Sequence, residues 1–163
     1  LTACLVAFAL VSCAPAEEPP PPPPPPVPAG TLAVEPSTIE LGFPSILGNP
    51  PKFSGFGWPA NKAIVIELEL PSGVVVPEVG PDENAPLATC VSDANGNFEV
   101  AMGAVTMLYT FFRTYLSGET FKPVMEEFDP LPPGTYTVIA SAVAAEAESA
   151  AATITIAAPP PKE

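Results

Sequence analysis

The chain has 163 residues, of which 26 are prolines, and its 5 basic and 18 acidic side chains give a net charge of −13. Because this charge repels the phosphate backbone, we expect no nucleic-acid partner. The chain contains no histidine, which excludes Ser-His-Asp and Cys-His catalytic pairs and the commonest general base near neutral pH, so we expect no enzyme and no cofactor.

The first 12 residues form an apolar segment that is too short to span a bilayer. We expect residues 1–12 to be the remainder of a signal peptide whose basic N-terminal part precedes this sequence. The apolar run closes with Leu10, Val11, Ser12 and Cys13, and this tetrad resembles the lipobox of bacterial lipoproteins. The resemblance implies cleavage before Cys13, a diacylglycerol on its sulfur and attachment to a membrane.

Residues 13–30 are expected to form a lipidated, disordered linker. Its centre is a run of eight prolines at 19–26, which favours a polyproline II rod of roughly 25 Å. The rod is interpreted as a spacer that holds a domain away from the membrane, and a ligand for SH3 or WW domains is the alternative. The prolines leave Cys13 no core to be buried in, which argues against an ordinary buried thiol.

The segment 31–157 is predicted to form one β-rich domain, followed by a disordered tail at 158–163. Short alternating or β-branched runs separated by turn residues are typical of an all-β sandwich. The clearest run places four apolar side chains on one face of a strand, which are Ile64, Ile66, Leu68 and Leu70. The predicted strands cover residues 32–35, 38–41, 52–57, 63–70, 73–76, 88–92, 97–102, 135–142 and 150–157.

Four marks in this segment, taken in order, resemble those of bacterial surface immunoglobulin-like domains. They are Val34-Glu35-Pro36, Gly55-Phe56-Gly57-Trp58-Pro59-Ala60-Asn61-Lys62, Asp93-Ala94-Asn95-Gly96-Asn97-Phe98 and Pro133-Gly134-Thr135-Tyr136-Thr137-Val138. The resemblance spans most of the segment and implies an immunoglobulin-like β-sandwich. Because such folds host many roles, it specifies no function.

A segment near 104–117 departs from that pattern. Its apolar residues recur at helical spacing: Ala104, Leu108, Phe111, Phe112 and Tyr115. The spacing predicts an inserted helix of three to four turns that ends at Ser117-Gly118, although the β-branched and aromatic content leaves an extra hairpin open. The helix is expected to plug one end of the sandwich, and an exposed aromatic docking patch is the alternative.

Trp58 and Phe56 are the candidate ligand contacts. Trp58 follows a glycine-rich turn and precedes Pro59, so its ring is placed to stack on a sugar at the end of the sandwich. The simpler interpretation is that this ring closes the core.

Asp93, Asn95 and Asn97 stand at alternate positions, as the first ligands of a calcium loop do. The acid expected at the twelfth position of such a loop is replaced by Ala104. A hairpin turn with Gly96 at positive φ explains the same residues, so we expect no metal here.

Glu67 and Glu69 are two residues apart on one predicted strand, a spacing of roughly 6–7 Å that glycosidase carboxylates also show. Two solvated acids on the outer face of a strand are the simpler interpretation, because nothing nearby in the sequence supplies an apolar pocket. Cys90 is left without an intramolecular partner once Cys13 carries lipid and Cys4 leaves with the signal, and it is expected to be buried and inert.

These features predict a non-catalytic lipoprotein of the bacterial cell envelope, anchored through the lipid on Cys13 and facing outside the cytoplasm. The domain is expected to be a structural or adhesion module, or an accessory subunit, with an envelope protein, a surface protein or a glycan as partner. The alternative is a ligand-binding lipoprotein that recognises a carbohydrate or peptide through Trp58 and Phe56.

Overall fold

The computed structural model describes residues 30–42, 46, 48–80, 82–124, 128–143 and 148–158. The lipobox residues Leu10, Val11, Ser12 and Cys13, the proline run at 19–26 and most of the C-terminal tail lie outside the described residues. Two β-sheets and one short helix make up the described part. The expectation of an all-β protein is therefore confirmed.

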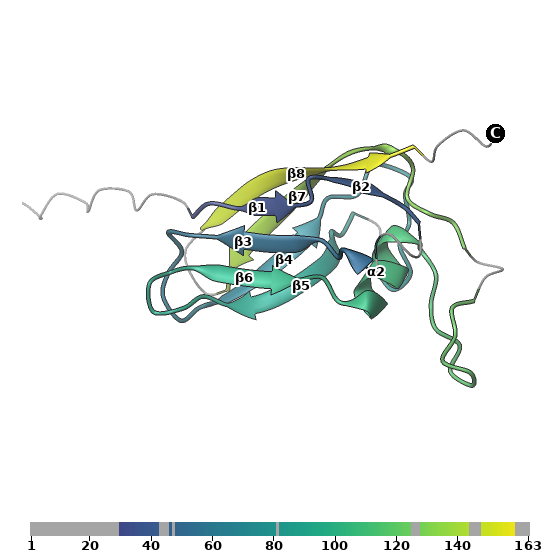
Figure 1. Ribbon diagram of the computed structural model, residues 1–163, viewed down its shortest axis with the longest axis horizontal. Coiled ribbons are helices and arrows are strands. Elements are labelled where there is room, and N and C mark those ends of the chain that lie inside the picture. The colour runs from purple at the N-terminus through teal and green to yellow at the C-terminus, as the bar shows by residue number, and fades with distance from the viewer. Residues whose placement is uncertain are drawn as a thin grey trace, which may run out of the picture.

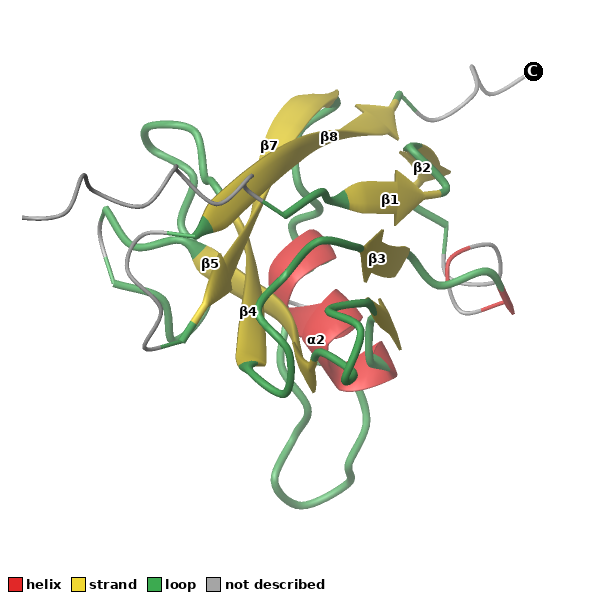
Figure 2. Ribbon diagram, turned by 90° about the vertical axis from the view of Figure 1, so that its left-hand side faces the viewer, coloured by secondary structure: helices red, strands yellow, loops and turns green. Residues whose placement is uncertain are grey.

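The strands form two sheets that pack around a common core (Figure 1). The first sheet has the order β1 (Ala33–Glu35), β3 (Lys52–Gly55) and β6 (Phe98–Ala101). The second has the order β2 (Thr38–Glu40), β8 (Ser149–Ala157), β7 (Gly134–Ala142), β4 (Ala63–Leu68) and β5 (Ala85–Val91). Every pairing is antiparallel except that of β2 with β8. Figure 2 shows that the second sheet curls around the core.

Period-two alternation in the sequence explains which faces are buried. In β4 the side chains of Ile64, Ile66 and Leu68 are buried, whereas those between them are partly exposed. In β8 the same rule buries Ile154 and Ile156. Successive side chains of a strand point to opposite faces, so one apolar row from each strand supplies the core. The first sheet contributes aromatic residues to the same core, which are Phe53 and Phe98.

The loops that connect the strands lie in two groups, at opposite ends of the domain. One group comprises residues 30–31, 56–62 and 92–97, which we call the Trp58 end. The other comprises residues 69–84, helix α2 (Ala104–Phe111) and residues 113–124, which we call the helix end. Figure 1 shows β1 beginning at the first of these ends and α2 lying at the second.

Helix α2 is shorter than the sequence predicted. It buries Met107, Leu108 and Phe111, and it ends at Phe111 rather than at Ser117-Gly118. The cause is Arg113, which takes a left-handed conformation with φ +47° and stops the helix without a glycine. The predicted extent of 104–117 is therefore wrong at its C-terminal end.

The alternative prediction for this segment, an extra hairpin of two paired strands, is not found. After the helix, residues 113–124 form a loop whose two arms meet at one isolated bridge between Leu116 and Pro123. Phe111 and Phe112 are fully buried, as the expectation of a plug requires. They therefore do not form an exposed docking patch.

The predicted strand at residues 73–76 is also wrong. Gly73 to Val76 belong to the long connection between β4 and β5 and pair with no strand in the described part. An apolar run alone does not make a strand, because the backbone of a strand needs a neighbouring strand to satisfy its N–H and C=O groups. Here Val76 is buried against the core while Val75 is exposed.

Candidate functional site

Trp58 is a core residue of the Trp58 end. Its side chain is only 4% exposed, and its indole Nε1 donates a hydrogen bond of 2.8 Å to the carbonyl oxygen of Thr31. The ring packs edge-on against Phe98, with ring centroids 5.7 Å apart. Gly30 and Gly55 lie so close to the indole that a side chain at either would overlap it. The covered ring leaves little surface on which a sugar could stack.

Phe56, the second candidate ligand contact, is 65% exposed. Its backbone N–H donates to Thr31 Oγ1 at 3.1 Å, and its carbonyl accepts from the N–H of Thr31 at 2.8 Å. Trp58 and Phe56 therefore both hold the start of the domain in place through Thr31. Of the pair, only Phe56 presents an open aromatic surface.

Asp93 shapes the turn between β5 and β6. Its Oδ1 accepts hydrogen bonds of 2.8 Å from the backbone N–H groups of Asn95 and Asn97, and its Oδ2 accepts one from the Asn97 side chain. These bonds, the Asn97 amide foremost, lower the pKa of Asp93 below its ordinary value. Gly96 has φ +77°. The residues thus have the hairpin-turn geometry, with both carboxylate oxygens of Asp93 accepting hydrogen bonds from within the turn.

No metal centre is found in the described ranges, where no three His, Cys, Asp or Glu side chains are grouped to hold an ion. Glu67 and Glu69 line different hollows rather than one catalytic cleft. Cys90 is a free cysteine that is partly buried, and desolvation raises the pKa of its thiol. The expectation that it is buried is correct only in part.

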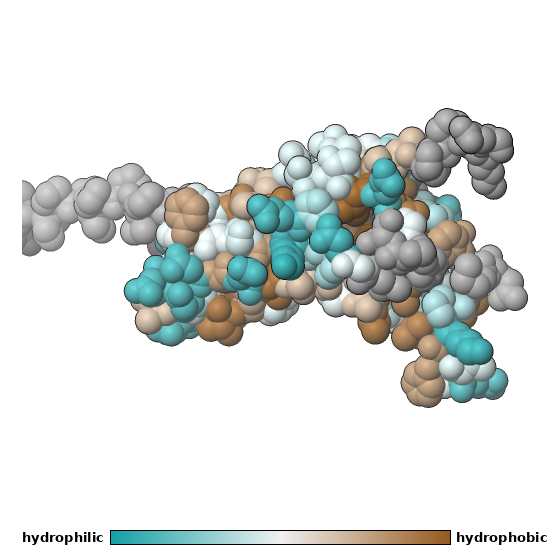
Figure 3. Space-filling model, viewed as in Figure 1, coloured by the Kyte–Doolittle hydropathy of each residue, from teal (hydrophilic) through white to brown (hydrophobic). Residues whose placement is uncertain are grey.

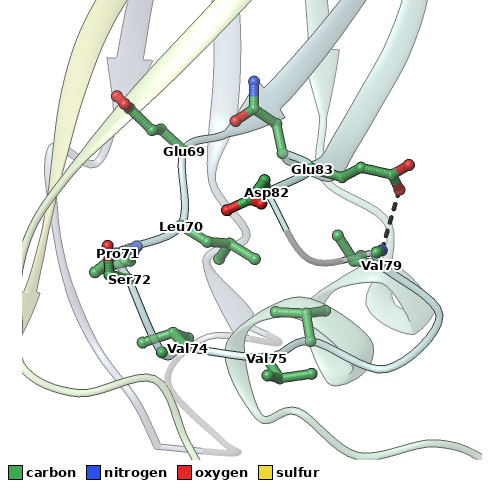
Figure 4. Close-up of a pocket in the computed structure, with 13 residues that line it drawn as sticks. Glu69, Leu70, Pro71, Ser72, Val74, Val75, Val79, Asp82 and Glu83 are labelled. Carbon is green, nitrogen blue, oxygen red and sulfur yellow. Dashed lines mark hydrogen bonds between the residues drawn. The ribbon is translucent and has the colours of Figure 1, made fainter.

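A hollow lies at the helix end, in the connection between β4 and β5. It has a volume of about 440 Å³. Figure 4 shows its two sides: the carboxylates of Glu69, Asp82 and Glu83 on one, and the side chains of Val74 and Val75 on the other. We call it the acidic groove, defined by the lining residues Glu69, Leu70, Pro71, Ser72, Gly73, Val74, Val75, Val76, Val79, Gly80, Asp82, Glu83 and Asn84.

The groove is built mainly from turn residues. Glu83 closes one turn, because its Oε2 accepts a hydrogen bond of 3.0 Å from the N–H of Gly80. A second hollow of about 390 Å³ adjoins the groove and lies between its Val76–Asn84 side and helix α2. None of the lining residues of either hollow is basic. The two hollows therefore offer apolar surface bordered by carboxylates.

A loop of residues 113–124 projects from the helix end of the domain (Figure 1). Backbone hydrogen bonds from Ser117 N to Lys122 O and from Phe121 N to Ser117 O, both 2.9 Å, close its tip. Phe121 lies at that tip with its side chain 77% exposed. Figure 3 shows apolar and hydrophilic surface side by side on the projecting part. We call residues 113–124 the projecting loop.

Arg113 ties the projecting loop to its neighbours. Its Nε donates to the carbonyl oxygen of Asp129 at 2.6 Å, its Nη1 donates to the carbonyl oxygen of Val75 at 3.3 Å, and its Nη2 pairs with the Asp129 carboxylate. Its positive charge also opposes the rise that burial causes in the pKa of Tyr136. One side chain thus connects the groove, the end of the helix and the approach to β7.

Replacing Arg113 with alanine is expected to destabilise the protein by about 2 kcal/mol, because the hydrogen bonds of a largely buried side chain are lost while its ion pair with the exposed Asp129 adds little. Arg113→Gly is the matched control, since glycine also loses the side chain but adopts the positive φ without strain. We expect glycine to cost about 1 kcal/mol less than alanine in urea unfolding. Equal stability of Arg113→Ala and the unmodified protein would contradict the role of Arg113 as a tie.

Sequence reasoning missed the acidic groove, Arg113 and Phe121. The groove residues were predicted in part to be a strand, and nothing in the local sequence marks Arg113 as the end of a helix. No described helix is long and apolar enough to cross a membrane. No family model and no curated protein matches the chain.

Proposed function

We propose that this protein is a non-catalytic lipoprotein of the bacterial cell envelope, anchored by lipid on Cys13 and facing outside the cytoplasm. The observation that carries the proposal is the order of three sequence segments: an apolar run that ends in Leu10-Val11-Ser12-Cys13, a proline-rich linker, and a β-rich domain. Lipid chains insert with roughly 0.8 kcal/mol per methylene, so a multiply acylated cysteine anchors durably. The domain then serves as a displayed structural, adhesion or accessory module.

The finer fold that we propose for the domain is an immunoglobulin-like sandwich. The split first strand supports it, since β1 pairs with β3 in one sheet and β2 runs parallel to the last strand β8 in the other. Tyr136 near the start of β7 adds support. Its hydroxyl donates a hydrogen bond of 2.6 Å to the carbonyl oxygen of Pro132, the arrangement known as a tyrosine corner in such sandwiches.

The side chains of the described residues favour a non-catalytic role. The chain has no histidine, and the two candidate carboxylates do not share one hollow: Glu67 lies on β4, whereas Glu69 follows the end of that strand. The acidic groove is bordered by carboxylates and hydrophobic side chains, without a nucleophile paired to a base. This composition suits recognition better than reaction chemistry.

The position of residues 30 and 31 indicates which end of the domain faces the membrane. Residues 30 and 31 lie at the Trp58 end, held by Trp58 and Phe56, whereas the acidic groove and the projecting loop lie at the helix end. A linker from Cys13 would therefore attach at the Trp58 end. The helix end would face away from the membrane, where partners are met.

Intact mass after membrane extraction tests the anchor. The complete open reading frame is expressed in a bacterial host, and we expect a polypeptide that begins at Cys13 and carries diacylglycerol, with or without a further acyl chain. Cys13→Ser is the matched control and is expected to lose the lipid mass and the membrane association together. A wild-type protein that leaves the membrane without lipid would overturn the proposal.

A further inference from the structure

The tip of the projecting loop and the acidic groove have complementary surfaces. Phe121 is a large apolar side chain with 77% of its surface exposed, and Lys122 beside it is basic and also exposed. The groove offers apolar surface from Leu70, Val74 and Val79 with carboxylates along its border. An aromatic ring flanked by an ammonium group matches such a groove both in polarity and in charge.

The loop is also shaped in advance to present this pair. The hydrogen bonds between Ser117 and residues 121 and 122 hold the tip closed, and Ser117 Oγ accepts further bonds from the N–H groups of Glu119 and Thr120. Phe121 itself has φ +52°, a conformation that a bulky residue seldom adopts and that costs roughly 1 kcal/mol or more. A preformed tip loses little conformational entropy when it binds.

The loop does not fill the groove of its own chain, because Phe121 is exposed. Arg113 nevertheless joins the base of the loop to the groove at the helix end, through its bond to the carbonyl oxygen of Val75. A second copy approaching this end can therefore place its loop in the first copy's groove while receiving the first copy's loop in its own. Such a reciprocal exchange is the defining property of a two-fold contact.

We infer that two copies of this chain associate through their helix ends, with Phe121 and Lys122 of each copy bound in the acidic groove of the other. The net charge of −13 opposes the approach of two copies. At roughly 0.15 M salt the Debye length is about 8 Å, so charges outside the contact are largely screened and the local pairs decide. Glu119 also lies on the loop and limits the attraction, so the dimer is weak and reversible.

Sedimentation velocity tests this inference separately from the anchor. The sample is the chain from residue 13 onward with Cys13→Ser, which lacks residues 1–12 and cannot be lipidated at this position. We expect a concentration-dependent dimer at protein concentrations up to about 1 mM. Phe121→Ser should raise the dissociation constant of the dimer at least tenfold. A chain that stays monomeric over that range, or a dimer that Phe121→Ser leaves unchanged, would overturn the inference.

Exchanging the charges of Lys122 and Glu69 tests whether the projecting loop of one copy contacts the acidic groove of the other. Lys122→Glu and Glu69→Lys are each expected to weaken self-association, because each places like charges together in both halves of the contact. In a dimer of one copy of each variant, one half carries the exchanged charges and the other half keeps the original pair of Lys122 and Glu69. Both halves of this mixed dimer are therefore attractive, and we expect labelled Lys122→Glu at trace concentration to bind Glu69→Lys more tightly than it binds unlabelled Lys122→Glu.

Glu99→Lys on β6 is the matched control, because it makes the same change in net charge away from the groove. Its mixed dimer with Lys122→Glu keeps one half in which two glutamates face each other. Labelled Lys122→Glu should therefore bind Glu99→Lys at least several-fold more weakly than it binds Glu69→Lys. Equal binding to the two lysine variants would show a general charge effect and sink the assignment of the surfaces.

Discussion

Replacing Phe112 with aspartate is expected to leave the protein largely unfolded. Phe112 is 1% exposed, and its ring stacks on that of Phe128 with centroids 5.2 Å apart. Loss of a buried phenylalanine ring costs about 3–5 kcal/mol, and a buried carboxylate adds the cost of removing a charge from water. The sum approaches the whole stability of a typical domain, about 5–15 kcal/mol. Circular dichroism and urea unfolding measure the outcome.

Two control variants separate the loss of core packing at Phe112 from the introduction of a carboxylate. Phe112→Leu keeps most of the apolar volume and is expected to cost about 1–2 kcal/mol. Phe121→Asp introduces the same carboxylate at an exposed position and is expected to change stability by no more than about 0.5 kcal/mol. A folded Phe112→Asp variant of normal stability would contradict the role of this region as a plug.

Replacing Gly96 with alanine is expected to cost about 3 kcal/mol or more. Gly96 has φ +77°, and a Cβ at this position would overlap the carbonyl oxygen of Trp58. The backbone would have to shift, which would disturb the bond of 3.0 Å from Trp58 N to the Gly96 carbonyl. Urea unfolding gives the free energy, and loss of the ordered environment of Trp58 should appear in its near-ultraviolet dichroism.

Gly73→Ala is the matched control for this substitution. Gly73 has φ +85°, and a Cβ there would meet no atom within 4 Å. Its replacement therefore carries only the strain of a positive φ, about 1–2 kcal/mol. The excess cost of Gly96→Ala measures the close packing of the turn against Trp58. Equal costs for the two variants would show that this packing contributes nothing.

Much of the sheet structure could be predicted from local pattern. Ile64, Ile66 and Leu68 alternate with other residues along one strand, and Ile154 and Ile156 do the same near the C-terminal end of the domain. All five are buried on strands as that pattern predicts. Leu70, expected on the same face, instead follows the end of β4 and is only partly buried. Alternation succeeds because side-chain direction in a strand is a property of the backbone itself and needs no knowledge of the neighbours.

The helix end could not be predicted in the same way. Residues 73–76 have the composition of a strand, but no neighbouring strand pairs with them in the described part of the chain. The helix was expected to continue to Ser117-Gly118, yet it stops because Arg113 adopts a positive φ while its side chain bonds to Asp129 and Val75. The bonds of Arg113 reach partners 16 and 38 residues away in the sequence.

Composition and local pattern were enough to establish the all-β class, the buried rows of the strands and the acidic character of the protein, since charge and period-two geometry act locally. Only the packing of distant segments established that Trp58 is covered while Phe121 is exposed, and that the β4–β5 connection forms a groove beside the projecting loop. The physical reason is that burial and concavity depend on which distant segments pack together. No short stretch of sequence contains that information, because it is set by the packing of the whole core.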